Sequence, residues 1–320
     1  MVLRGPIFIF HDSAQRIQMD ARRLLTIFAL DFFSICIYHT SNATGRDSSP
    51  SIDVTPNNKR LQGRFYGSVE PAFLDSEGIM YEIKERVRYS EVGGSQDITI
   101  TALVNYLQDC STFHSADIGL TLDRLNELHK AWLLSYWDIY VERMPRLYEN
   151  ITVGTSPHAF RGVLGRRNFW IKDSEGNYLL RADSIWFCFD TERQRPVKID
   201  EEMVSSFGEL EDVLKLTAGD RKVQEPEKMV EAPAIKIEPH HIDTNHHVNN
   251  ARYLQIADDV LSAVTEGKES FTSGRIRAEY RKAAVLGDIM IPMYGKSANG
   301  GIVVSLRSET GDVFCNIEFL

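Results

Sequence analysis

The stretch that decides the fold is a polar loop, His240-His241-Ile242-Asp243-Thr244-Asn245-His246-His247-Val248-Asn249-Asn250. A strand is predicted before it at 234–238, and an amphipathic helix after it at about 250–264. Four more strands are then predicted, separated by turns that contain glycine: 274–284, 289–295, 302–307 and 313–319. This order indicates an α+β unit in which one helix packs on an antiparallel sheet.

The same plan occurs once before in the chain, with little residue identity. A strand is predicted from Met80 to Tyr89, a helix over 99–113, and then strands at 131–144, 148–154, 158–172 and 178–190. Two similar units in tandem are the simplest architecture. We expect an N-terminal domain at 80–200, an acidic linker at 201–232 with a short helix near 210–216, and a C-terminal domain at 233–320.

Residues 1–79 lack this patterning. The stretch 40–68 is rich in Ser, Asn, Gly and Pro, which is typical of a linker or a disordered segment. The apolar run 24–38 is interrupted by Asp31 and is short for a membrane span. We expect a poorly structured leader and no membrane span, with Met80 as the functional start; secretion is the less favoured alternative.

Composition describes an acidic globular protein of 320 residues with a net charge of -9 and 43% hydrophobic residues. The negative charge argues against a general nucleic-acid binder, which needs a basic surface. The four cysteines are scattered and form no paired motif. We therefore expect buried thiols in a reducing compartment, and a cytoplasmic location.

The polar loop holds the candidate catalytic residues. A histidine can act as general acid or base near neutral pH, and the Asp243 carboxylate could orient it or position water. The Asn245 amide and the free N–H groups at the start of the following helix could stabilise an oxyanion. This combination suits hydrolysis of an activated acyl group. Because His246 and His247 are adjacent, only one is expected to face the site, and the residues alone do not say which.

Other residues of the loop have plainer roles. Asn249 is well suited to cap the helix. His240 and His241 follow Pro239 at the end of a strand and are expected on the surface. Four histidines within eight positions suggest zinc, but no H-E-x-x-H spacing supports it, so neither a metal nor another cofactor is expected.

Residues 242–253 resemble the D-x-N-x-H-V-N-N-x-x-Y signature of the acyl-acyl-carrier-protein thioesterases of plants and bacteria. Further segments resemble the same family in the same order: Arg88–Gly93, Leu103–Cys110, Arg167–Phe169, Asp183–Trp186, Arg195–Val197 and Glu279–Lys282. The resemblance covers about residues 81–320.

The resemblance implies two tandem hotdog domains, the first binding the acyl chain and the second carrying catalysis. Asp243, Asn245 and His247 match the catalytic positions of the family, which favours His247 over His246. The expected reaction is hydrolysis of fatty acyl-acyl carrier protein in fatty acid biosynthesis. The expected partner is acyl carrier protein with its phosphopantetheine-linked acyl chain.

The sequence departs from the family at one point. Plant members carry a glutamate and a cysteine where this chain has Ala283 and Ala284, so a carboxylate that could activate water is missing. Glu279 is a possible substitute on the same predicted strand. An acyl-CoA thioesterase and a non-catalytic acyl-carrier binding module therefore remain alternatives. Chain length and oligomeric state stay open. Arginines are candidates for docking the acidic carrier protein: Arg161, Arg166, Arg167, Arg193 and Arg195.

Overall fold

The structure, a computed structural model, describes residues 73–74, 80–216, 220–265 and 271–320. The chain divides into two compact units, 1–62 and 63–320, and the description concerns the second. The predicted leader and the apolar run 24–38 lie almost entirely outside the described residues. Within the part described, no helix is long and apolar enough to cross a membrane.

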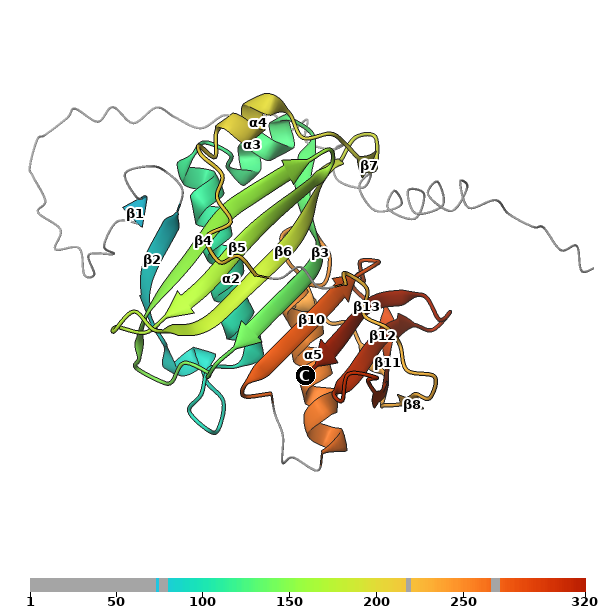
Figure 1. Cartoon of the computed structure of the whole chain (residues 1–320). Helices are drawn as coiled ribbons and strands as arrows, with labels where there is room; N and C mark the ends of the chain where they lie inside the picture. The colour runs from blue at the N-terminus through green and yellow to red at the C-terminus, as the bar shows by residue number, and fades with distance from the viewer. Residues whose placement is uncertain (1–72, 75–79, 217–219, 266–270) are drawn as a thin grey trace, which may run out of the picture. The chain divides into compact units, whose positions relative to one another are not determined.

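The first half is a five-stranded antiparallel sheet with one long helix on it (Figure 1). The helix is α2 (Ile100–Asp117), and it contacts strands β2 and β4. In sheet order the strands are β2 (Tyr81–Arg86), β4 (Asn150–Arg161), β5 (Leu164–Lys172), β6 (Tyr178–Asp190) and β3 (Lys130–Val141). Smaller elements flank them: β1 (Phe73–Leu74), α3 (Leu122–Glu127), β7 (Arg195–Pro196) and α4 (Glu201–Ser205).

The second half repeats this arrangement around helix α5 (Asn250–Val264), which contacts β11, β12 and β13. Its main strands in sheet order are β10 (Gly274–Tyr280), β13 (Val313–Phe319), β12 (Ile302–Ser308) and β11 (Ile289–Lys296). The short strands β8 (Val230–Glu231) and β9 (Ile235–Lys236) pair with β11. The α+β class and the tandem hotdog architecture predicted from the sequence are confirmed.

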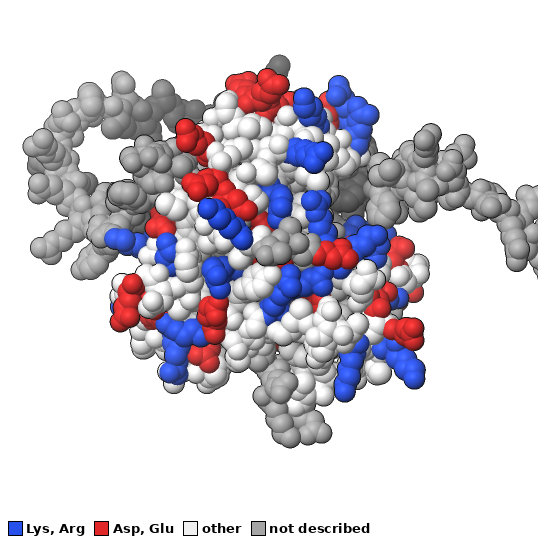
Figure 2. Space-filling model, viewed as in Figure 1, with Lys and Arg blue, Asp and Glu red and all other residues white. Residues whose placement is uncertain are grey.

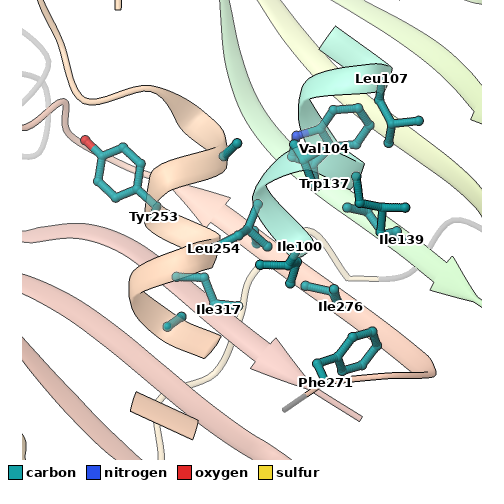
Figure 3. Close-up of a cluster of buried hydrophobic side chains, with 14 of the residues drawn as sticks. Ile100, Val104, Leu107, Trp137, Ile139, Tyr253, Leu254, Phe271, Ile276 and Ile317 are labelled. Atoms are coloured by element: carbon teal, nitrogen blue, oxygen red, sulfur yellow. The ribbon is translucent and has the colours of Figure 1, made fainter. Parts of the chain in front are cut away.

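The two halves share one continuous antiparallel sheet. Strand β3 pairs with β10 from Tyr136–Glu279 to Val141–Gly274. Helices α2 and α5 run antiparallel against each other, and Figure 3 shows their apolar side chains meeting those of the central strands. The continuous sheet and both helices therefore have a common apolar core, which fixes the second helix against the first.

The linker crosses the outer, polar face of this sheet. Its Leu214 N–H donates to Asn168 Oδ1 at 3.2 Å, and the Tyr136 hydroxyl donates to the Asp220 carbonyl at 3.2 Å. Arg307 pairs with Glu225 at 2.8 Å. Polar side chains from both halves are thus hydrogen-bonded to one connecting segment. The helix predicted near 210–216 is wrong: this segment is irregular, and the short helix is α4 instead.

The predicted division between a strand at 148–154 and a strand at 158–172 is also wrong. Strand β4 continues to Arg161, and the turn occurs at Gly162, which has a φ of 64°. A Cβ atom on Gly154 would lie 2.1 Å from the Trp170 ring. Gly154 is therefore required by the close packing of an aromatic side chain on the strand, and not by a turn.

Candidate active site

The loop between η2 (Pro239–His241) and α5 is a tight turn closed by its own backbone. The Asp243 N–H donates to the His247 carbonyl at 2.8 Å, and the His246 N–H donates to the Asp243 carbonyl at 3.1 Å. The Asn245 N–H donates to Asp243 Oδ1 at 2.8 Å, so the carboxylate also forms an Asx turn. The turn brings the three predicted residues, Asp243, Asn245 and His247, to one end of the loop.

His246 occupies the position that needs an unusual backbone. Its φ is 62°, a left-handed conformation that is uncommon outside glycine but in which asparagine, aspartate and histidine are enriched. Its side chain is exposed, whereas that of His247 is half-buried. The two adjacent histidines therefore have different environments.

His247 has the electrostatics of a general base. Burial lowers the pKa of its imidazole below the ordinary value, the Asp243 charge opposes this effect, and the His246 ring adds to it. A lowered pKa leaves the ring neutral near pH 7, and a neutral ring can accept a proton from water. The backbone of His247 also bridges to Val285, which ties the loop to the segment after β10.

The start of α5 supplies donors beside this loop. Asn249 caps the helix, since its Oδ1 accepts the Ala251 N–H at 2.9 Å, as predicted. The Arg252 N–H donates to the Asn249 carbonyl at 2.9 Å. Asn250 is the first residue of α5, where backbone N–H groups have no acceptor within the helix. Its N–H is therefore a candidate donor for a ligand oxygen.

Two buried tyrosines hold the helix start and the neighbouring loops in place. The Tyr253 hydroxyl accepts the Ala284 N–H at 2.8 Å, and the Ala284 carbonyl accepts the Val248 N–H at 2.9 Å. The Tyr280 hydroxyl donates to the Asn250 carbonyl at 2.9 Å. Burial raises the pKa of both phenols, so both stay protonated.

The structure places no carboxylate of strand β10 at the position of Ala283 and Ala284. Ala283 is half-buried and Ala284 is fully buried. Glu279 faces another part of the molecule, because its Oε2 accepts the Val223 N–H of the linker at 3.1 Å. Strand β10 also ends at Tyr280, so the two-residue alternation does not continue to Ala283. Glu279 is therefore not placed to substitute.

The first half contributes a side chain that sequence patterns did not reveal. The Asn250 amide donates to Gln108 Oε1 at 3.1 Å, and the Gln108 amide lies 3.5 Å from the cap oxygen of Asn249. Gln108 belongs to α2 and is more than 140 positions away in sequence. Only the packing of α2 against α5 brings it to the site, and no local signal could have identified it.

The remaining loop histidines are His240, which is exposed, and His241, which is half-buried. His241 Nδ1 accepts the Glu238 N–H at 2.9 Å, which completes a capping box, and the His240 ring lies 3.9 Å from it. The described residues contain no group of three or more His, Cys, Asp or Glu side chains that could hold a metal. These histidines therefore act in local structure.

The arginines expected to dock a carrier protein divide into two groups. Arg161, Arg193 and Arg195 are exposed, whereas Arg166 pairs with Asp183 and Arg167 is buried at 7% exposure. Figure 2 shows basic and acidic side chains interspersed over the face that carries the sheet. Arg167 is thus a wrong choice for docking, because its guanidinium lies inside the first half.

Comparison with known proteins identifies two family domains, in the same order as the two halves of the structure. Residues 78–207 match the acyl-ACP thioesterase N-terminal domain, and residues 224–319 match the acyl-ACP thioesterase C-terminal domain. The dodecanoyl-[acyl-carrier-protein] hydrolase of Cinnamomum camphora is 24% identical over 254 residues, covering 73% of this chain and 65% of the relative. The oleoyl-acyl carrier protein thioesterase 1 of Arabidopsis thaliana is 26% identical over 198 residues, covering 57% and 54%.

Solved structures share the fold. An oleoyl thioesterase (putative) from Lactobacillus plantarum superposes with a TM-score of 0.67 at 22% identity, covering 77% of this chain and 97% of that one. The 12:0-ACP thioesterase from Umbellularia californica has a TM-score of 0.61 at 18% identity, covering 75% and 95%. The chain spans 65%, 52% and 59% of the length of the first three curated relatives. With both domain models matched in order on a tandem hotdog fold, the chain belongs to the acyl-ACP thioesterase family.

Proposed function

We propose that this protein hydrolyses fatty acyl-acyl carrier protein to free fatty acid and carrier protein. The observation that carries the proposal is the turn 243–247, which holds a carboxylate, an amide and a half-buried neutral imidazole beside the start of α5. Curated relatives of the chain are named dodecanoyl-[acyl-carrier-protein] hydrolase, palmitoyl-acyl carrier protein thioesterase and oleoyl-acyl carrier protein thioesterase.

In the proposed mechanism, water attacks the thioester carbon directly. His247 takes a proton from the water while Asp243 orients the ring and stabilises the imidazolium. The carbonyl oxygen becomes an oxyanion that accepts hydrogen bonds from the Asn250 N–H and the Asn245 amide. When the tetrahedral intermediate collapses, the C–S bond breaks and the imidazolium returns its proton to the leaving sulfur. No acyl-enzyme is required.

The two halves are proposed to divide the work. The domain at 80–200 binds the acyl chain, the domain at 233–320 carries catalysis, and residues 201–232 connect them. Support comes from the position of the polar turn 243–247 in the second half. Burial of Cys110, Cys188 and Cys315 supports a reducing, cytoplasmic location for the enzyme.

Carrier-protein docking is proposed at the exposed arginines of the first half. Arg161, Arg193 and Arg195 offer positive charge to an acidic partner, and opposite charge accelerates encounter. Because Arg166 is already paired with Asp183, it contributes less.

The alternative functions make different predictions in one assay. Thiol and fatty acid release is measured from carrier-protein and coenzyme A thioesters of the same chains, with His247→Ala as the control. Faster release from carrier protein supports the proposal, and faster release from coenzyme A supports an acyl-CoA thioesterase. Because Ala283 and Ala284 replace a carboxylate that could activate water, a non-catalytic binding module is also tested. Tight binding of acyl carrier protein with no release above the control would overturn the proposed hydrolysis.

A further inference from the structure

The interior of the first half contains a polar pair between the sheet and its helix. Arg167 of β5 donates from Nη1 to His114 Nδ1 of α2 at 3.1 Å and to Thr155 Oγ1 at 3.2 Å. His114 is fully buried, and its ring stacks on Tyr81 at a centroid distance of 5.0 Å. The Phe207 ring covers the guanidinium at 5.3 Å. Tyr81, Phe207 and Thr155 therefore surround the pair, and both of its members are buried.

His114 has an unpaired ring N–H, and Arg167 is a buried cation without a counter-charge among the described residues. Because Nδ1 of His114 accepts from Arg167, the ring proton lies on Nε2, and this atom is buried with no partner among the described residues. Burial lowers the pKa of His114 to about 3, so the ring is neutral. The Arg167 guanidinium has no carboxylate partner within the described part of the chain. A buried cation without a counter-charge and a buried N–H without an acceptor are both unfavourable, so within the described residues His114 Nε2 lacks an acceptor and Arg167 lacks a carboxylate.

The second half shows that the fold does not need this pair. Helices α2 and α5 begin at Ile100 and Asn250, so the position of α5 equivalent to His114 is Val264. Strands β5 and β12 have a bulge at the same place, after Ile171 and after Leu306. Counting back four residues from each gives Arg167 in the first half and Ile302 in the second.

Val264 and Ile302 both pack against the apolar core. The same two positions are thus apolar in one half and polar in the other. A purely structural pair would have no reason to replace apolar packing, since burying a lone guanidinium destabilises the fold. Positions that lower stability without a packing reason are expected to serve binding or catalysis.

The pair lies farther along α2 than the proposed reaction centre. The start of α5 meets α2 at Gln108, and His114 is six residues beyond, which is about 9 Å along the helix axis at 1.5 Å per residue. Only the distal part of an acyl chain could extend from the turn 243–247 to this depth.

We propose that His114 and Arg167 bind an oxygen atom on the distal part of the acyl chain, so that the enzyme prefers oxygenated over plain alkyl chains. This inference rests on the proposed thioesterase function. The unpaired group of His114 is a donor, and the Arg167 guanidinium is a cation, so a hydroxyl, ketone or carboxylate oxygen would suit both. A terminal methyl group at the same place would leave them unsatisfied.

The test measures kcat/KM for matched acyl carrier proteins from octanoyl to hexadecanoyl. Each length is prepared with a methyl, a hydroxyl and a carboxyl group at the far end. We expect an oxygenated chain to exceed the plain chain of equal length by about tenfold or more at one or several lengths, since hydrogen bonds to charged groups are strong. A preference for plain chains at every length would overturn the inference.

The variant that carries the second half's residues, His114→Val with Arg167→Ile, provides the matched comparison. It should retain release from plain chains and lose the preference for oxygenated ones. His114→Phe is the milder variant, because it keeps the stack on Tyr81 and removes the ring N–H. An unchanged preference in a folded variant of either kind would overturn the inference.

Binding separates this inference from the proposed function. The His247→Ala variant is titrated with the same acyl carrier proteins, and the dissociation constants are compared. Tighter binding of oxygenated chains supports the inference even if the wild type releases no thiol, which would count against hydrolysis alone. Equal or weaker binding of oxygenated chains at all lengths contradicts the inference.

Discussion

The loops 89–100 and 239–250 have the same backbone and different side chains. In each, the turn is closed by an N–H to carbonyl bond, at 3.0 Å in the first loop and 2.8 Å in the second. Each has one residue with a positive φ at the same place, Gln96 at 67° and His246 at 62°. Each ends where a long helix begins, α2 or α5.

The side chains at equivalent positions are chemically unlike. The first loop has a glycine, a serine and an aspartate where the second has a carboxylate, an amide and an imidazole: Gly93, Ser95 and Asp97 against Asp243, Asn245 and His247. Asp97 forms an ion pair with Arg146 at 3.3 Å. The turn is therefore a property of the fold, and the capacity for acid-base chemistry is a property of the second copy.

The largest expected effect is on turnover. His247→Ala should reduce kcat by about 10²–10⁴-fold, which is the usual contribution of a general base. Asp243→Ala should abolish measurable release. Asp97→Ala in the first loop is the matched control and should leave kcat unchanged. Thiol release under single-turnover conditions, with circular dichroism to check folding, measures both. Full activity in either second-loop variant contradicts the proposed roles.

The second prediction concerns acid stability and compares the interiors of the two halves. Since burial lowers the pKa of His114 to about 3 and the unfolded ring titrates near 6.5, the unfolded state binds the extra proton between these values. The unfolding free energy is therefore unaffected by this group above about pH 6.5, and it falls as the pH is lowered from 6.5 toward 3, because the unfolded state gains the proton first. The loss is on the order of 3–5 kcal/mol at 1.36 kcal/mol per pH unit.

Urea unfolding of the wild type and of the His114→Val, Arg167→Ile variant at several pH values measures this difference. The variant should be at least as stable at pH 7 and should lose less stability in acid, because the valine and isoleucine side chains that replace His114 and Arg167 do not titrate. Parallel pH curves for the two proteins contradict the prediction.

Tyr253 offers a third comparison. Its hydroxyl accepts the Ala284 N–H at 2.8 Å, whereas the equivalent residues of the first half are Leu103 and Pro145, and proline has no N–H. Tyr253→Phe leaves a buried N–H without a partner and should cost about 1–3 kcal/mol of unfolding free energy. Adding Ala284→Pro removes that N–H and should recover part of the loss. A larger loss in the double variant than in the single one argues against this explanation.

The smallest effect is a shift of the pH profile. Because the pKa of His247 is lowered, kcat/KM should stay on its plateau below the ordinary histidine value and then fall in acid. His246→Asn keeps a residue that tolerates the positive φ and removes a charge that lowers the pKa of His247. The acid limb should move up by a few tenths of a pH unit while kcat on the plateau is retained. A shift in the opposite direction contradicts the assigned cause.

Local signals were sufficient for much of the fold. Helix α5 has the predicted bounds, because an asparagine cap and apolar periodicity define both of its ends. Strand β6 likewise begins and ends where alternation predicts. The strand predicted to end at 154 continues to Arg161, because Gly154 lies within the strand and leaves room there for the Trp170 ring.

The sequence by itself determined the class of each segment, the repeated plan and the residues of the polar turn, because caps, periodicity and turn residues act over a few positions. Tertiary structure decided the joining of β3 to β10, the approach of Gln108 to α5 and the contact of Glu279 with the linker. It also decided that Arg167 is buried and that the pKa of His247 is lowered. These properties depend on which surfaces lose water when segments distant in sequence pack together. Local sequence patterns do not specify which distant segments will meet.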